Sequence, residues 1–174
     1  MSLKVNHFIV ISALVFIATG ATVLIDIWSY CLKKFFNIKS LDYALVGRWI
    51  LVFIHSGQLK HQHITQAPAQ KFEKPCGWAI HYFIGFAFTC GFIAITGISW
   101  LQQPQLPSAM LFGLSTVLFP FLIMQPCFGL GLFAGKVPHP WQARLKSIMT
   151  HVLFGVGLFM GAKIFMWFMA IFPH

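Results

Sequence analysis

The chain has 174 residues, of which 58% are hydrophobic and 9% are charged, and twelve Lys and Arg against three Asp and Glu give a net charge of +9. Soluble domains carry about a quarter charged residues, so this composition excludes a water-soluble fold of this size. No basic recognition helix or aromatic reader motif accompanies the positive charge, so we expect no nucleic-acid partner.

Four apolar runs are each long enough to cross a membrane. A helix of about 20 apolar residues spans the roughly 30 Å of hydrocarbon in a bilayer. The runs lie near residues 7–31, 77–101, 106–134 and 146–171. The sequence therefore predicts an all-α, polytopic membrane protein in which residues 1–174 form a single transmembrane domain with four spanning helices.

The first run also has features of a signal peptide, namely Lys4, an apolar stretch and the small residues "ATGA". The apolar run continues through "TVLIDIW", however, and Lys33 and Lys34 follow it. These charges favour an uncleaved span whose N-terminus lies outside the cell.

The connection between the first two spans, residues 32–76, contains a shorter apolar segment. Residues 41–55 are too few to cross the membrane, and Arg48 interrupts them. We expect a short amphipathic helix, with Ser40 as its N-cap, that either lies on the membrane surface or dips into it. The polar, proline-bearing stretch "GQLKHQHITQAPAQKFEKP" that follows is predicted to be a loop.

The third span contains helix breakers. Pro120 and Pro126 flank Gln125, and a proline within a span frees backbone carbonyls that neighbouring groups must satisfy. The sequence therefore predicts a kink near Gln125.

Basic residues gather in two of the connections. They are Lys33, Lys34, Lys39, Arg48, Lys60, Lys71 and Lys74 after the first span, and Lys136, Arg144 and Lys146 before the fourth. The positive-inside rule predicts that both segments lie in the cytoplasm and that both termini lie outside. Attraction to anionic lipid headgroups, at about 1 kcal/mol per basic residue, makes the bilayer surface the expected partner of this face.

Polar side chains inside the spans are the candidate functional residues, because such groups are expensive at membrane depth. Asp26, His81 and His151 each lie four or five residues from the cytoplasmic end of their span, about 6–8 Å inside the boundary. Gln125 lies somewhat deeper in the third span. Their shared depth predicts one ligand or proton site made by Asp26, His81, Gln125 and His151.

The two histidines share a local pattern, His-x-x-x-Gly, which places a glycine one turn away on the same helix face. A glycine there lets another helix or a ligand approach the imidazole closely. Small-residue helix packing is predicted at Gly85, Gly155, Gly157, Gly161, Gly131 and Gly135.

Two other roles for the polar residues stay open. An Asp–His pair can simply hold helices together through a charge-assisted hydrogen bond, and interhelical polar contacts in membranes contribute about 0.6–2 kcal/mol. Alternatively, Asp26, His81 and His151 could supply three ligands of a metal site, with His61 or His63 from the loop as a fourth. The sequence itself requires no cofactor.

Several segments carry a resemblance to a known family: "GRW" at 47–49, "GQLKHQHI" at 57–64, "GWAIHYFIGFAF" at 77–88, "MQPCFGLG" at 124–131 and "ARLKSIMTHVLFGVGL" at 143–158. In order and over most of the chain, they resemble a bacterial "domain of unknown function" family of small four-span inner-membrane proteins. The resemblance implies a bacterial inner membrane and four helices, and it implies no activity. The loop departs from the family pattern at Leu59 and Gln62, which weakens a metal role for the loop histidines.

Three functions remain as hypotheses. The first is a small transporter- or sensor-like protein with a polar Asp/His site near the cytoplasmic side; four spans make a narrow pathway, so a homodimer is expected. The second is a structural or assembly protein whose polar cluster only fixes helix packing. The third is a membrane-embedded, metal-dependent enzyme acting on a lipid-like substrate. No HExxH, DxxD or nucleophile-plus-base pattern supports a reaction, so the sequence favours the enzyme least and leaves enzyme activity undecided.

Overall fold

The computed structural model describes residues 7–171, and every regular element within this range is helical. Four helical segments are long and apolar enough to cross a membrane: α1 (His7–Phe36), α3 (Glu73–Thr96), the segment Leu106–Cys127 and α7 (Pro140–Ile171). The prediction of an all-α fold with four membrane-capable helices is therefore confirmed.

The third span is interrupted. It consists of α5 (Leu106–Ser115), the π-helical turn η2 (Pro120–Met124) and the short α6 (Gln125–Cys127). The regular helix stops at Ser115, about ten residues before the kink predicted at Gln125. Proline carries no backbone N–H, so Pro120 cannot continue an i→i−4 ladder, and Gln125 donates instead to the carbonyl of Pro120, five residues back.

The spans differ in length from those predicted. The second ends at Thr96 because Gly97 adopts φ +83°, and the chain then forms the separate short helix α4 (Ser99–Gln102). The third ends at Cys127, so Gly131 and Gly135 lie outside any span. The prediction that this glycine pair forms a small-residue helix face is wrong, because the backbone there is turn and 3₁₀ helix, η3 (Leu132–Ala134).

The short helix in the first connection is α2 (Tyr43–Ser56), and it is followed by the single 3₁₀ turn η1 (Ile64–Gln66). Its N-cap is Asp42, whose side chain accepts a hydrogen bond from the backbone N–H of Ala44 at 3.0 Å, rather than the predicted Ser40. Asp42 caps the helix instead of Ser40 because the side-chain oxygen of an N-cap must lie within reach of the N–H groups of the first turn. Gly57, at φ +71°, ends the helix.

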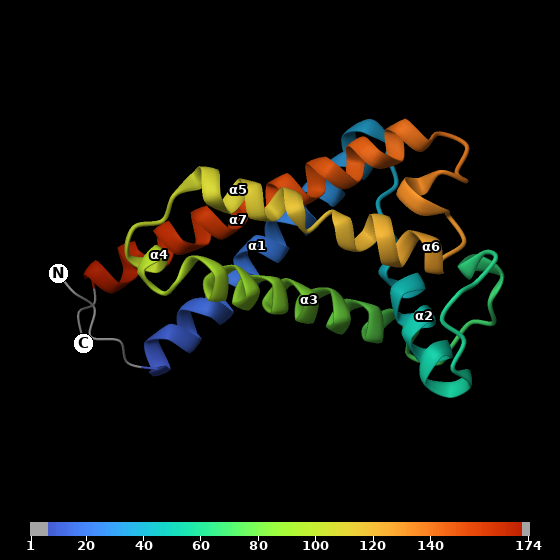
Figure 1. Cartoon of the computed structure of the whole chain (residues 1–174), viewed down its shortest axis with the longest axis horizontal. Helices are drawn as coiled ribbons and strands as arrows, with labels where there is room; N and C mark the ends of the chain where they lie inside the picture. Colours follow the sequence, from blue (N-terminus) through green and yellow to red (C-terminus); the bar gives the residue numbers. More distant parts are fainter. Residues whose placement is uncertain (1–6, 172–174) are drawn as a thin grey trace.

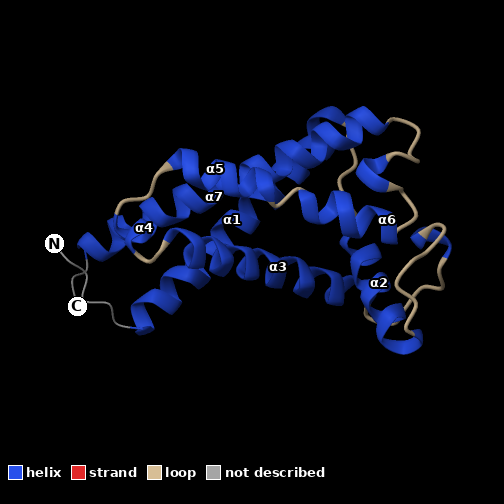
Figure 2. Ribbon diagram, viewed as in Figure 1, coloured by secondary structure: helices blue, strands red, loops and turns tan. Residues whose placement is uncertain are grey.

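All four spans run roughly along the longest axis of the molecule (Figure 1). α1 begins and α7 ends at one end of the bundle, whereas α2 and α6 lie at the opposite end. The long loops that join α2 to α3 and α6 to α7 lie at this second end too (Figure 2). Most of the basic residues of the two connections therefore gather at the end that carries α2, which we call the α2 end.

Close backbone approach holds the spans together. A side chain at Gly157 would come within 2.6 Å of the Cα of Ala21 on α1, and one at Gly161 within 3.2 Å of the Cα of Ile17. Lipid is as apolar as the helix surfaces, so such small-residue contacts supply much of the packing between spans. Around them lies a core to which α1, α3, α4, α5 and α7 all contribute, and which includes Phe92 and Leu158.

Candidate ligand cavity at the α2 end

Asp26 connects three helices at the α2 end. Its Oδ1 accepts a hydrogen bond from the Tyr43 hydroxyl of α2 at 3.2 Å and lies 3.1 Å from Nε2 of His81 on α3. Its Oδ2 accepts a hydrogen bond from the Tyr82 hydroxyl of α3 at 2.9 Å. The predicted approach of Asp26 and His81 is thus present, and two tyrosines that the sequence did not single out complete the group. We call these four residues the Asp26 cluster.

The cluster is packed as well as hydrogen-bonded. The imidazole of His81 stacks on the Tyr43 ring, with centroids 4.0 Å apart and planes inclined by 22°. Burial raises the pKa of the Tyr43 hydroxyl, and the neighbouring Asp26 carboxylate raises it further. Tyr43 therefore stays protonated and remains a donor to Asp26. The rarity of tyrosine is the one sequence signal that could have identified Tyr43 and Tyr82, since the chain has three tyrosines and two of them lie in this cluster.

Two features hold α2 against α3 and so fix the position of Tyr43. At the crossing, Gly47 and Gly77 face each other's helix, and a side chain at Gly47 would overlap the carbonyl of Glu73, whereas one at Gly77 would overlap that of Tyr43. Beside this crossing, Arg48 donates two hydrogen bonds of 2.8 Å to the Glu73 carboxylate. These bonds raise the pKa of the Arg48 guanidinium, so this clamp keeps its charge.

His151 is not part of the Asp26 cluster. Its Nδ1 lies 2.7 Å from the Thr116 hydroxyl, at the break in the third span. The Thr116 hydroxyl in turn donates to the carbonyl of Gly113 at 2.6 Å, which uses its one proton. Because the Gly113 carbonyl can only accept, both contacts are hydrogen bonds when Nδ1 of His151 carries a proton and donates to Thr116. The predicted direct convergence of His151 with Asp26 does not occur, because a nearer acceptor on the third span takes its Nδ1.

The glycine of each His-x-x-x-Gly pattern allows a neighbouring helix to approach closely, as predicted. A side chain at Gly85 would overlap the Thr22 hydroxyl on α1, and one at Gly155 would overlap the carbonyl of Ala109 on α5. Gly113, which the sequence did not single out, faces Gly155, and a side chain at Gly113 would come within 2.6 Å of the Gly155 backbone nitrogen. Each histidine thus lies where its helix closely approaches the preceding span.

The other two predicted site residues lie elsewhere. Gln125 is buried, and its Oε1 has no hydrogen-bond partner in the described structure, but it does not line the cavity described below. His61 is buried at the third span, where its backbone N–H donates to the carbonyl of Cys127 at 2.9 Å. Within residues 7–171, no three His, Cys, Asp or Glu side chains are close enough to hold a metal ion together.

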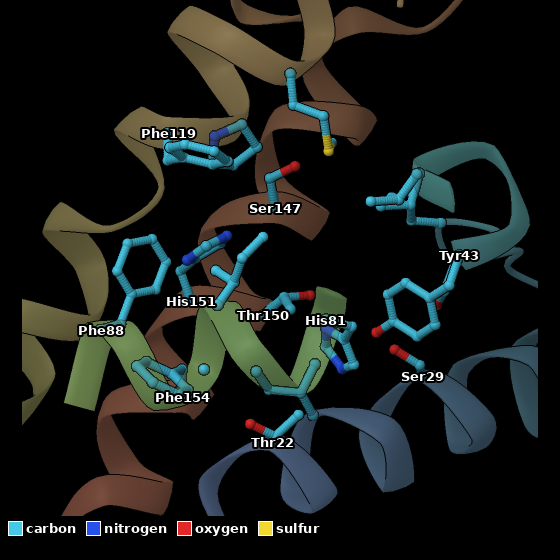
Figure 3. A pocket seen from close by; sticks show the side chains of 18 of the residues that line it. Thr22, Ser29, Tyr43, His81, Phe88, Phe119, Ser147, Thr150, His151 and Phe154 are labelled. Atoms are coloured by element: carbon cyan, nitrogen blue, oxygen red, sulfur yellow. The ribbon is translucent and has the colours of Figure 1, made fainter. Parts of the chain in front are cut away.

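A cavity of about 190 Å³ lies beside the Asp26 cluster. Ser147, Thr150 and His151 project toward it from α7, and Tyr43 and His81 approach from α2 and α3 (Figure 3). Phe88, Phe119 and Phe154 contribute apolar surface. Further lining residues are Thr22, Ile25, Ser29, Ser40, Leu41, Val46, Ile84, Gly85, Pro120, Met124 and Lys146. The two predicted histidines therefore share a cavity although they do not touch.

The irregular part of the third span forms one wall of this cavity. Pro120 and Met124, the first and last residues of η2, both line it. Turns of π-helix are rare and frequently occur at functional sites, because they widen a helix and redirect its side chains. The cavity exists where the third span departs from a regular helix.

The acidic residues of the chain are all engaged in hydrogen bonds. Asp26 accepts from its cluster, Asp42 caps α2, and Glu73 pairs with Arg48. They are the three acidic residues of the whole sequence. Among residues 7–171, no side-chain carboxylate thus remains free to balance a cation in the cavity.

Residues 15–165 match a family described as "Protein of unknown function (DUF2938)". The chain belongs to this family. No curated protein and no solved structure matched the chain. The range matched by DUF2938 runs from α1 into the second half of α7 and includes every residue of the Asp26 cluster and of the cavity. The residues that make the site are therefore part of the family domain.

Proposed function

We propose that this protein is a small multi-pass protein of the bacterial inner membrane that binds a small molecule in the cavity at its α2 end, as a transporter or sensor does. The observation that carries the proposal is the cavity itself. Buried pockets that take ligands combine apolar walls with a few converging polar groups, and this one presents two imidazoles and several hydroxyls among aromatic rings.

We propose further that the α2 end faces the cytoplasm and that both termini lie outside. The basic connections at this end favour the cytoplasmic side, where Lys and Arg near anionic headgroups are stabilising. In this orientation the cavity lies near the cytoplasmic boundary, and a ligand could reach it from that side.

The architecture gives bound ligand a way to act on the helices. A molecule in the cavity contacts α1, α2, α3, η2 and α7 together. The π-helical turn and the separate α5 make the third span the element best able to change shape. Because a ligand shifts a conformational equilibrium only through differential contacts, a site shared by five elements suits both transport and sensing.

The proposal is tested by filling the cavity. Ser147→Phe places a ring in the cavity, and Met149→Phe places the same ring on the exposed surface of the same helix. The purified protein in lipid nanodiscs is titrated with one-ring probes, from benzene and phenol to benzoate. We expect at least one probe to bind wild type and Met149→Phe and to lose binding in Ser147→Phe. Absence of binding by every probe to folded wild type would contradict the proposal.

A purely structural role is the second candidate, and one observation favours it for the Asp26 cluster. Asp26 accepts three hydrogen bonds from two other helices, which is what a helix clamp requires. Under this alternative, Asp26→Asn lowers stability and no variant changes the binding of any probe. If Ser147→Phe abolishes probe binding while Asp26→Asn leaves it intact, the clamp and the ligand site are separate parts of the protein.

A further inference from the structure

The hydrogen bonds around His151 determine what it offers to a ligand. Its Nδ1 carries the proton that is donated to Thr116, so in the neutral imidazole Nε2 has a lone pair and is an acceptor. Nε2 forms no hydrogen bond within residues 7–171, and His151 lines the cavity. A ligand that satisfies this nitrogen must bring a hydrogen-bond donor.

Lys146, in contrast, favours a ligand with a negatively charged group. It lines the cavity, and its Nζ donates to the backbone carbonyl of Lys39 at 2.6 Å, which uses one of three ammonium protons. It forms no ion pair with any described carboxylate, and the three acidic side chains of the chain are engaged elsewhere. A cation beside an apolar cavity without a counter-ion favours an anionic ligand.

The size and walls of the cavity limit the rest of the ligand. A cavity of about 150 Å³ is known to hold a benzene ring, so this half-open cavity of about 190 Å³ has room for a single ring with small substituents. Phe88, Phe119 and Phe154 supply aromatic surface for such a ring. Lys146 and His151 are five residues apart on α7, which separates them by roughly 7.5 Å along the helix.

We propose that the ligand is a one-ring hydroxy acid: its acid group lies at Lys146, its ring packs against the wall formed by the three phenylalanines, and its hydroxyl donates to Nε2 of His151. This inference rests on the proposed function, because it names the class of molecule that the cavity takes. Thr116 is a positioning residue, since it fixes the tautomer of His151 without touching the ligand.

Four probes separate the contributions: 4-hydroxybenzoate has both groups, benzoate lacks the hydroxyl, phenol lacks the acid, and 4-methoxybenzoate has the ring and acid but no donor. Binding is measured by calorimetry on wild-type protein in nanodiscs. We expect 4-hydroxybenzoate to bind at least tenfold more tightly than each of the other three, because an unpaired buried polar group weakens binding by about this factor.

Variants assign each preference to its residue. Lys146→Gln should lower the affinity for the three acids about tenfold and leave phenol unchanged, whereas Lys33→Gln, at the exposed end of α1, should change none of the four affinities. His151→Phe should remove the preference for 4-hydroxybenzoate over benzoate. Thr116→Val, a smaller change, should reduce that preference because the imidazole can then place its proton on Nε2.

The outcomes distinguish the two proposals. If phenol binds as tightly as 4-hydroxybenzoate, or if the preference for acids persists in Lys146→Gln, the hydroxy-acid inference is overturned. The proposed function then still stands, provided that Ser147→Phe abolishes phenol binding. If no probe binds folded wild-type protein, both proposals are overturned.

Discussion

Replacing Asp26 by Asn tests whether the Asp26 cluster holds α1, α2 and α3 together. Asn keeps the shape of the side chain but removes its charge and one of its two acceptor oxygens, so at least one of the donors from Tyr43, His81 and Tyr82 loses its acceptor. The Asp26 and His81 side chains are only 18% and 16% exposed, so solvent screening is weak.

The size of the effect follows from the number of contacts. Interhelical polar contacts in membranes average about 0.6 kcal/mol and reach about 1.7 kcal/mol. Three such contacts give about 2 kcal/mol, and up to about 5 kcal/mol if each is at the upper end. We therefore expect Asp26→Asn to lower the free energy of unfolding by about 1–2 kcal/mol and Asp26→Ala by about 2–4 kcal/mol.

The assay uses a cysteine already in the core. Cys127 is 4% exposed and becomes available to a thiol-reactive fluorescent dye when the protein unfolds on heating in detergent. Tyr82→Phe, which removes one hydroxyl of the cluster, should combine non-additively with Asp26→Asn, with a coupling energy of at least about 0.5 kcal/mol. Tyr30→Phe, at an exposed tyrosine on the same helix as Asp26, is the matched control.

Two results would refute this reasoning. One is a melting temperature of Asp26→Ala within 1 °C of wild type, because a change of 1 kcal/mol shifts a domain of this size by roughly 2–4 °C. The other is simple additivity of Asp26→Asn and Tyr82→Phe, which would show that the hydrogen bond between them contributes nothing.

Three further predictions concern the scaffold and its orientation. Gly47→Ala should destabilise the protein by several kcal/mol, because the new methyl group would overlap a backbone carbonyl of α3. Gly20 has open space around it, so Gly20→Ala should be neutral or stabilise by up to about 1 kcal/mol. Thermal unfolding of the two variants tests this difference. Arg48→Lys should destabilise the protein by about 1–3 kcal/mol, because Lys cannot make the paired hydrogen bonds to the Glu73 carboxylate. The same change should speed proteolysis of the loop after α2, and an unchanged cleavage rate would contradict this. For orientation, alkaline phosphatase fused after Gln103 should be active, being outside, and fused after Lys60 should be inactive; the reverse pattern would invert the proposed topology.

The sequence was sufficient for features that depend on local properties of the chain. Span length and hydropathy predicted four membrane-capable helices and the short α2, because twenty apolar residues in a row have few alternatives to crossing a bilayer. Polar side chains are costly inside apolar helices, which singled out Asp26 and His81 as residues that need partners, and the two are in contact with each other. The spacing of Gly157 and Gly161 likewise indicated a close helix contact that the structure contains.

Tertiary structure alone decided which partner each polar group took. His151 lies in the fourth span, as predicted, but its hydrogen-bond partner depends on the rotation of each helix and on where the third span breaks. The break after Ser115 places Thr116 within reach of the imidazole and opens the wall of the cavity at η2. The order of residues determines how far along its helix each side chain lies. The direction in which that side chain points within the bundle is determined only when the helices pack against one another.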